Sequence, residues 1–287
     1  MKKAKKVIGF ILRVGIISYL GTLILLASCQ RRFIYHPTTR PMENVERRAT
    51  NNDLIKWESS SDTFYGWYLE PAIRASQTNT LVVFHGNAGY AIDRLYFAHG
   101  FQYHAIAPDV AWKVFLFEYP GYGGKPGKPS EKAIRQEAVS ALIELNDNET
   151  DIFLLGESLG TGIASYLSSE LPELVKGLVL VTPFTSLSDV AKLHYPFFPV
   201  NLCLTESYNN AKHLKSYDGP TAFIVADNDN VVSTDSGLKL FNEYTGIKRL
   251  WQLSGSHNTL NYSVTEKWWL EVISFLLQKQ DIDTDEN

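Results

Sequence analysis

The sequence predicts an α/β fold in which a mostly parallel sheet carries helices on both faces. Short apolar runs alternate with segments of helical periodicity along most of the chain, which is typical of βαβ units. Runs such as 80–84 and 152–155 are almost entirely apolar, as expected of central strands that are buried on both sides. The chain has 287 residues, 45% of them hydrophobic, which is enough for one such domain.

Residues 1–28 form a unit of their own, with four lysines at the start and a mainly apolar run after them. A signal peptide needs an apolar stretch of about 7–15 residues, which residues 14–26 supply. Leu26-Ala27-Ser28-Cys29 then resembles the lipobox of a bacterial lipoprotein, in which Cys29 is lipidated. An uncleaved anchor of about 20 residues could instead run from Val7 to Ala27, although Arg13 lies inside it. We favour the lipoprotein, and both interpretations place the domain outside the cytoplasm and at a membrane.

The remaining elements follow in order after an irregular linker over 29–50. The α/β domain is expected over 51–280, with a cap excursion over about 183–217. An acidic tail follows over 281–287. Segments 54–58 and 64–69 predict a hairpin. We expect further strands at 80–84, 113–119, 178–181, 221–226 and 249–253, and helices at 130–145, 234–244 and 264–280, with Ser130 as the N-cap of the first helix.

A candidate nucleophile lies where an apolar strand meets a helix. The segment 156–160 reads Gly-Glu-Ser-Leu-Gly, the pattern of a nucleophile elbow in which Ser158 occupies a sharp turn above the sheet. Glycines on either side let the strand and the helix approach closely. Because a serine hydroxyl needs a base to become nucleophilic, the remaining chain must supply one.

The candidate base and acid follow later strands. Among His194, His213 and His257, only His257 lies directly after a strand, so we assign it as the base. Asp227 and Asp229 both follow the strand 221–226. We prefer Asp229 as the acid that orients the histidine, because Asp-Asn-Val resembles the acid motif of this fold, and we expect Asp227 to shape the loop.

An oxyanion hole is expected from two backbone N–H groups. The first belongs to Leu159, directly after the nucleophile, and the second to Asn87 in the loop after the strand 80–84. His85 begins this loop, and we expect it to brace the loop rather than to react.

Several motifs in the correct order resemble the membrane-associated α/β-hydrolase-domain serine hydrolases. They are His-Gly-Asn-Ala-Gly at 85–89, Tyr-Pro-Gly-Tyr-Gly-Gly at 119–124, the elbow, Pro-Phe-Thr-Ser at 183–186, Asp-Asn-Val at 229–231 and Gly-Ser-His-Asn at 255–258. The resemblance implies a hydrolase of carboxylic esters or thioesters, some members acting on lipids or acylated proteins. Ser233 and Lys125 depart from the family pattern, where proline and serine are common.

The sequence therefore predicts a serine hydrolase without a metal or other cofactor, acting on an acyl ester or thioester of a lipid or an acylated protein. Apolar residues of the cap are candidates to line an acyl pocket: Leu193, Tyr195, Phe197, Phe198, Val200, Leu202 and Leu204. A serine peptidase with the same triad and a non-catalytic binding protein on this scaffold are the alternatives. The net charge of −4 gives no basis for nucleic-acid binding.

Overall fold

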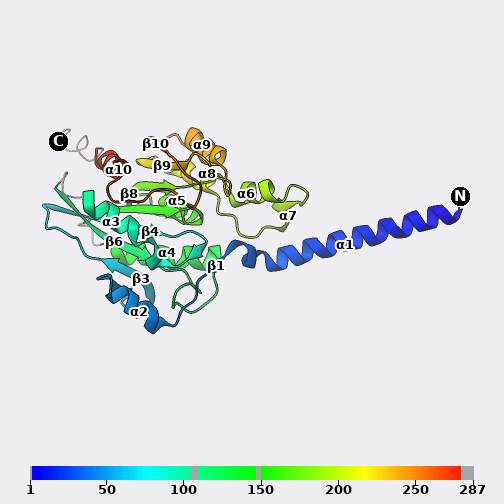
Figure 1. Ribbon diagram of the computed structural model, residues 1–287, viewed down its shortest axis with the longest axis horizontal. Helices are drawn as coiled ribbons and strands as arrows, with labels where there is room; N and C mark the ends of the chain where they lie inside the picture. The colour runs from blue at the N-terminus through cyan, green and yellow to red at the C-terminus, as the bar shows by residue number, and fades with distance from the viewer. Residues whose placement is uncertain (1, 105–108, 147–149, 279–287) are drawn as a thin grey trace.

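The computed structural model describes residues 2–104, 109–146 and 150–278. The acidic tail expected over 281–287 lies outside these residues. Figure 1 shows a domain built around one sheet, with a long N-terminal helix that projects away from it.

The sheet has eight strands in the order β10-β9-β8-β7-β4-β6-β3-β2. The strands from β10 to β6 pair in parallel, whereas β3 pairs antiparallel with both β6 and β2. This arrangement confirms the expected mostly parallel α/β sheet. The strand bounds are Ile55–Glu58 (β2), Phe64–Leu69 (β3), Gln77–Phe84 (β4), Val110–Phe117 (β6), Ile152–Glu157 (β7), Val175–Val181 (β8), Thr221–Ala226 (β9) and Lys248–Leu253 (β10).

Helices pack on both faces of the sheet. On one face, α5 (Leu159–Glu170) contacts α4 (Glu131–Leu145) and α8 (Asn210–His213), and α9 (Thr234–Glu243) lies beside α8. On the other face, α3 (Leu95–His104), which follows the 3₁₀ turn η1 (Ala91–Arg94), contacts α10 (Trp268–Leu277). Alternation along β7 separates the two faces, because Gly156 meets α5 whereas Phe153 packs beside Leu276 of α10. The expected cap on Ser130 is present, since its side chain accepts a hydrogen bond from the Ala133 N–H.

The excursion after β8 contains α6 (Leu187–His194), α7 (Val200–Cys203), α8 and the 3₁₀ turn η2 (Leu214–Ser216). The first two helices lie at the end of the domain from which α1 projects (Figure 1). They form the cap of the pocket described below.

The irregular linker expected over 29–50 is not observed. Helix α1 runs without interruption from Lys2 to Ile34, and α2 covers Met42–Thr50. Between them, β1 (His36–Pro37) pairs in parallel with β5 (Ala88–Gly89). The expectation failed because it rested on Pro37 and Pro41, which interrupt the chain only after the helix has ended and before α2 begins.

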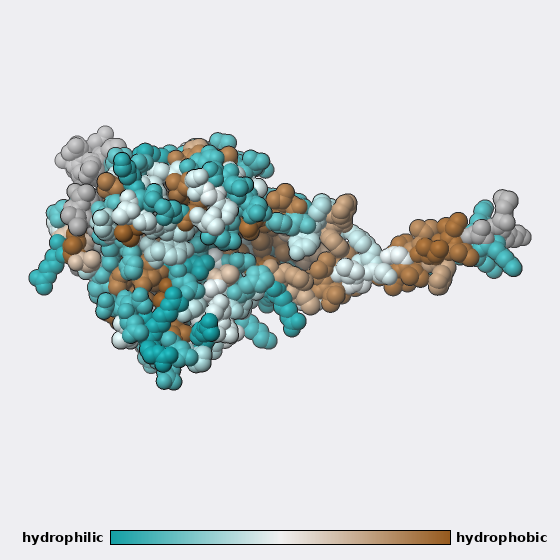
Figure 2. Space-filling model, in the orientation of Figure 1, coloured by the Kyte–Doolittle hydropathy of each residue, from teal (hydrophilic) through white to brown (hydrophobic). Residues whose placement is uncertain are grey.

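Helix α1 is long and apolar enough to cross a membrane, with a candidate span over Lys5–Ile34. Most apolar side chains in its outer part are exposed. Figure 2 shows brown along this part of α1 and again at the adjoining end of the domain, with a paler stretch between them.

Candidate active site

Ser158 occupies a strained turn between β7 and α5. Its φ of 50° and ψ of −116° lie in a region that side chains rarely adopt, and its neighbours are built to permit this. A Cβ atom on Gly160 would lie 2.1 Å from the Phe84 carbonyl oxygen, and one on Gly156 would lie 2.5 Å from the Gly160 carbonyl oxygen. Only glycine fits at these two positions, which explains the pattern read from the sequence.

The structure brings Ser158, His257 and Asp229 together from three separate strand ends. The Ser158 Oγ lies 2.9 Å from the His257 Nε2, and the His257 Nδ1 lies 2.7 Å from an Asp229 carboxylate oxygen. The hydroxyl can therefore donate its proton to the imidazole Nε2, while the Asp229 carboxylate accepts a hydrogen bond from the Nδ1–H on the other side of the ring.

Asp229 is held as a carboxylate. Burial acts to raise the pKa of this carboxyl, but hydrogen bonds from His257 and from the backbone N–H groups of Val231 and Val232 outweigh it, and the pKa is lowered. Asp227 instead accepts hydrogen bonds from the Ser254 hydroxyl and the Gly255 N–H. The preference for Asp229 over Asp227 thus agrees with the geometry, and Asp227 shapes the loop before His257.

The two expected oxyanion donors face the same pocket as Ser158. Leu159 and Asn87 both line it, and within the described residues their backbone N–H groups have no protein acceptor. Asn87 is fixed from three sides: its carbonyl accepts from the His36 N–H and the Tyr122 hydroxyl, and its side chain donates to the Ile34 carbonyl. The end of α1 therefore helps to position this loop.

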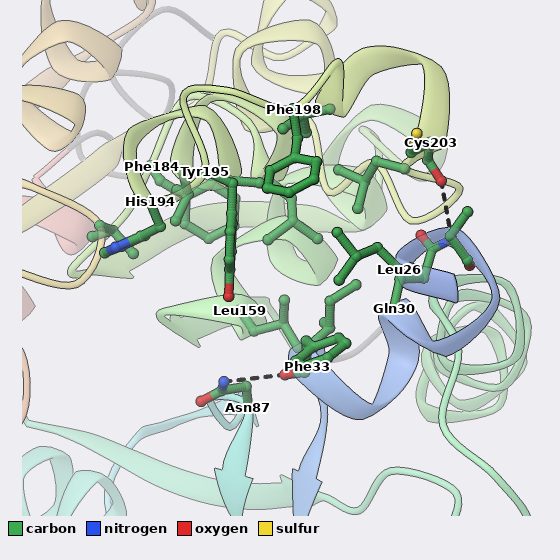
Figure 3. Close-up of a pocket in the computed structure, with 18 of the residues that line it drawn as sticks. Leu26, Gln30, Phe33, Asn87, Leu159, Phe184, His194, Tyr195, Phe198 and Cys203 are labelled. Atoms are coloured by element: carbon green, nitrogen blue, oxygen red, sulfur yellow. Dashed lines mark hydrogen bonds between the residues drawn. The ribbon is translucent and has the colours of Figure 1, made fainter. Parts of the chain in front are cut away.

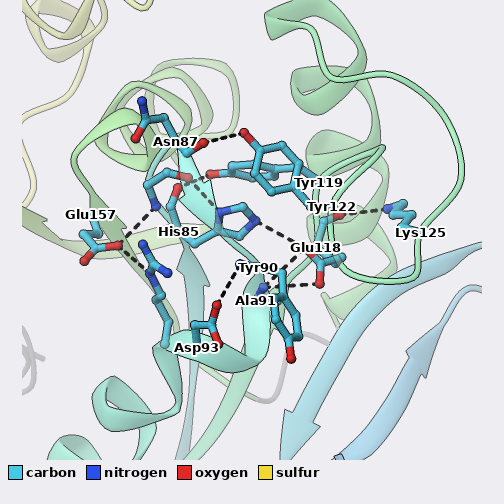
Figure 4. A network of polar contacts seen from close by, with 12 residues as sticks. His85, Asn87, Tyr90, Ala91, Asp93, Glu118, Tyr119, Tyr122, Lys125 and Glu157 are labelled. Atoms are coloured by element: carbon cyan, nitrogen blue, oxygen red, sulfur yellow. Dashed lines mark hydrogen bonds and ion pairs between the residues drawn. The ribbon is translucent and has the colours of Figure 1, made fainter. Parts of the chain in front are cut away.

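His85 braces the loop from below (Figure 4). Its imidazole is buried, stacks against Tyr119 and places Nδ1 2.8 Å from the Gly86 carbonyl oxygen. The Tyr119 hydroxyl donates to the His85 carbonyl, and Nε2 lies 3.4 Å from a Glu118 carboxylate oxygen. These contacts agree with the expectation that His85 supports the loop and does not react.

A largely buried ion pair lies beneath the elbow. Glu157 accepts hydrogen bonds from Arg94 at 2.7 Å, from the Tyr96 hydroxyl and from the Gly86 N–H. Burial acts to raise the pKa of the Glu157 carboxyl, but these partners reverse the effect and lower it. Glu157 precedes Ser158 and Gly86 precedes Asn87. The hydrogen bond from the Gly86 N–H to the Glu157 carboxylate therefore connects the two loops that meet at the site.

An apolar pocket of about 340 Å³ opens beside Ser158 (Figure 3). One wall comes from the cap, including Tyr195, Phe198, Val200 and Leu204, as the sequence predicts. Leu193, Phe197 and Leu202 were expected to line it too, but their side chains are exposed outside. His194 also lines the pocket and approaches the Val231 carbonyl, whereas His213 packs beside Arg135, away from it.

The opposite wall belongs to α1, which sequence reasoning had assigned to a signal or an anchor. Its lining residues are Leu23, Leu26, Ala27, Gln30, Phe33 and Ile34. Their spacing of three and four residues is that of one helix face, so the same stripe was present in the sequence. The sequence does not show that this stripe is a pocket wall, because an apolar run near the N-terminus also fits a signal peptide or a membrane anchor.

The two departures from the family pattern have local explanations. Ser233 has a φ of 63° and caps α9, a conformation that a proline ring, fixed near −65°, could not adopt. Lys125 is buried, donates to the Glu118 carbonyl and pairs with Glu137 at 2.6 Å. Neither residue reaches the pocket around Ser158.

Known proteins resemble this chain in both sequence and fold. The sequence profile of the alpha/beta hydrolase fold matches residues 79–202. An uncharacterized protein of Mycobacterium tuberculosis is 31% identical over 220 residues, which cover 74% of each chain. The chain belongs to the α/β-hydrolase superfamily.

Other α/β-hydrolases are more distant. The lysophosphatidylserine lipase ABHD12 of Rattus norvegicus is 28% identical over 206 residues, covering 66% of this chain and 50% of that protein. Among solved structures, an esterase of Pyrococcus furiosus has a TM-score of 0.59 at 15% identity, covering 79% of this chain and 90% of its own. Est1E of Butyrivibrio proteoclasticus, with ferulic acid bound, has a TM-score of 0.59 at 16% identity, covering 75% and 94%. These two structures agree in fold.

Proposed function

We propose that this α/β-hydrolase is a serine hydrolase that cleaves carboxylic esters or thioesters through an acyl-enzyme. The observation that carries the proposal is the chain of contacts from Ser158 through His257 to Asp229, at the edge of an apolar pocket. The lipase and esterase names among the similar proteins support it.

In the proposed reaction, the Ser158 Oγ attacks the acyl carbonyl carbon while His257 accepts its proton. The oxyanion is held by the N–H groups of Leu159 and Asn87. His257 then gives the proton to the leaving alcohol or thiol, which departs and leaves an ester on Ser158. Water, deprotonated by His257, attacks the carbonyl carbon of that ester. The bond to the Ser158 Oγ breaks, His257 gives its proton to that oxygen, and the carboxylic acid is released.

The substrate in this proposal is an acyl chain carried by a lipid or an acylated protein. The apolar lining of the pocket fits a hydrocarbon chain, and α1 would keep the domain at a membrane where such substrates are found. Cleavage before Cys29 would remove Leu23, Leu26 and Ala27 and with them part of the pocket wall, whereas an uncleaved α1 keeps the wall complete.

Labelling with a fluorophosphonate tests the proposal. We expect covalent labelling of the wild type at Ser158, and complete loss of labelling in Ser158→Ala. Ser263→Ala, which changes an exposed serine outside the pocket, is the matched control and should be labelled like the wild type. A folded wild type that takes up no label would instead indicate a non-catalytic protein, and label retained by Ser158→Ala would exclude Ser158 as the nucleophile.

A further inference from the structure

The pocket wall formed by α1 is a regular stripe on one side of the helix. From Leu23 to Ile34 the lining residues follow a helical repeat, whereas Ile24 and Leu25 between them are exposed on the other side. At 1.5 Å per residue, this wall is about 16 Å long and ends at the site of Ser158. A hydrocarbon chain lying in the pocket would therefore run parallel to α1.

Polar contacts fix α1 against the cap. The Gln30 side chain donates to the Cys203 carbonyl and accepts from the Thr205 N–H (Figure 3). Arg31 and the Tyr35 hydroxyl both bind the buried carboxylate of Glu206, at 2.7 and 2.6 Å. A flexible tether would need none of these bonds, so the wall is a built part of the site.

Contacts between α1 and the cap continue towards the N-terminus. The Tyr19 hydroxyl donates to the Phe197 carbonyl at 3.1 Å, and the Tyr19 ring stacks on Phe198. The Phe197 and Leu202 side chains are 88% and 86% exposed at this end of the cap. Two large apolar side chains of such exposure, beside a helix able to cross a membrane, give this end of the domain an apolar surface. Figure 2 shows brown atoms at this end.

The length of α1 places the membrane relative to the pocket. A hydrocarbon core of about 30 Å is crossed by about 20 helical residues, so a span that begins after Lys6 ends near Leu26. Leu26 belongs to the pocket wall. Tyr19 then lies about 10 Å inside the hydrocarbon, and with it the tip of the cap at Phe197. Arg13, about 10 Å from the other surface, can extend its side chain towards that surface.

We propose that the pocket is loaded from the lipid leaflet, along a wall formed by residues 23–34 of α1. The substrate acyl chain passes from the bilayer into the pocket between α1 and the cap and reaches Ser158 without crossing water. Phe197 and Leu202 enter the leaflet at the mouth of the pocket. This inference rests on the proposed acyl transfer to Ser158 and adds that α1 selects the chain and is retained in the mature protein.

The α1 wall is tested by placing the same bulky side chain on the face of α1 that lines the pocket and on its exposed face. In the full-length protein, Leu26→Trp fills the pocket, whereas Leu25→Trp adds the same bulk on the exposed side of α1. The measurement is the rate of Ser158 labelling by hexadecyl and by ethyl fluorophosphonate. We expect Leu26→Trp to lower the hexadecyl-to-ethyl rate ratio about tenfold or more and Leu25→Trp to leave it unchanged.

The outcomes separate this inference from the proposed function. A wild type labelled by both reagents, with the ratio unaffected by Leu26→Trp or lowered equally by Leu25→Trp, overturns the α1 wall and leaves the hydrolase intact. A wild type labelled by neither reagent overturns both. An intact mass showing that the mature chain starts at Cys29 also overturns the wall, because Leu23, Leu26 and Ala27 would be gone.

Loading from the leaflet has its own test. We expect Phe197→Asp to slow hydrolysis of a long-chain ester presented in phosphatidylcholine vesicles more than tenfold, with little change for a water-soluble acetate ester. Ile143→Asp introduces the same charge at an exposed apolar site on α4 and should affect neither substrate. An equal rate on vesicles for Phe197→Asp and the wild type, or an equal loss on both substrates, would exclude entry through the membrane.

Discussion

The two sides of the active site are built by different means. On the side of Ser158, His257 and Asp229, each group follows a strand of the sheet and is held by short-range backbone geometry. On the side of the acyl pocket, α1 and the cap come from segments about 170 residues apart and meet through side-chain contacts. In the proposed reaction, the first side determines the kind of bond that is cleaved, and the second determines which molecule reaches it.

Loss of the base should have the largest effect on the reactive side. His257→Ala leaves Ser158 without a proton acceptor, so we expect kcat to fall by about 10⁶-fold with little change in KM. Because the groups act as a unit, the double variant Ser158→Ala/His257→Ala should be no slower than either single variant. Steady-state hydrolysis of an activated ester measures both, and a double variant slower than either single one would show that the residues act independently.

The orienting acid should come next. In Asp229→Asn, the side-chain amide can donate a hydrogen bond to His257 Nδ1 instead of accepting one from it. This favours the wrong imidazole tautomer, so we expect kcat to fall about 10⁴-fold. Asp227→Asn, at the neighbouring carboxylate that binds the loop, is the control and should retain most of the activity. A larger loss of kcat in Asp227→Asn than in Asp229→Asn would show that Asp227, not Asp229, orients His257.

The ion pair beneath the elbow should affect stability. Glu157→Gln leaves the largely buried Arg94 guanidinium without its counter-charge, and we expect a loss of about 3 kcal/mol in the free energy of unfolding. The Glu157 carboxyl has a lower pKa in the folded than in the unfolded protein, so its stabilisation is complete above the unfolded value of about 4.3 and disappears as the pH falls through the folded value.

Urea unfolding in detergent at pH 7 and at stepwise lower pH measures this prediction. The difference between wild type and Glu157→Gln should shrink on acidification. Tyr96→Phe removes one hydrogen bond and keeps the ion pair, so it should cost only about 1 kcal/mol. A difference that is independent of pH would mean that the carboxylate charge contributes nothing.

The smallest effect is expected from the contact that joins the Asn87 loop to the end of α1. Asn87→Ala keeps the backbone N–H proposed to bind the oxyanion and removes only the side-chain bond to the Ile34 carbonyl. We expect a loss of about 1 kcal/mol, or about fivefold in kcat/KM, on soluble and vesicle substrates alike. Unchanged kinetics would show that α1 does not position the loop.

The same comparison explains what could be predicted from the sequence. The elbow, the strand ends and the assignment of Asp229 over Asp227 depend on residues close to a strand, so local patterns indicate them. The fold class is confirmed by the structure and the family match, while the catalytic assignments of Ser158, His257 and Asp229 stay predictions that the geometry supports. The pocket wall depends on long-range contacts such as Arg31 with Glu206, for which no local pattern exists.

Two of the incorrect expectations share this cause. Phe197 and Leu202 are as apolar as Phe198 and Val200, and only the position of α1 decides which of them face the pocket and which face outward. The linker expected over 29–50 rested on Pro37 and Pro41, which indicate breaks in the chain but not the bonds that hold these residues across the chain to 87–89 and 203–206.

The short pairing of β1 with β5 has a mechanical consequence. It joins the end of α1 to the loop of Asn87 within three residues, through the His36 N–H and the Ile34 carbonyl. If α1 spans a bilayer as proposed, a change in its tilt, such as a thicker or thinner bilayer imposes, is carried directly to the loop proposed to bind the oxyanion. The enzyme would then respond to the thickness of the membrane that holds it.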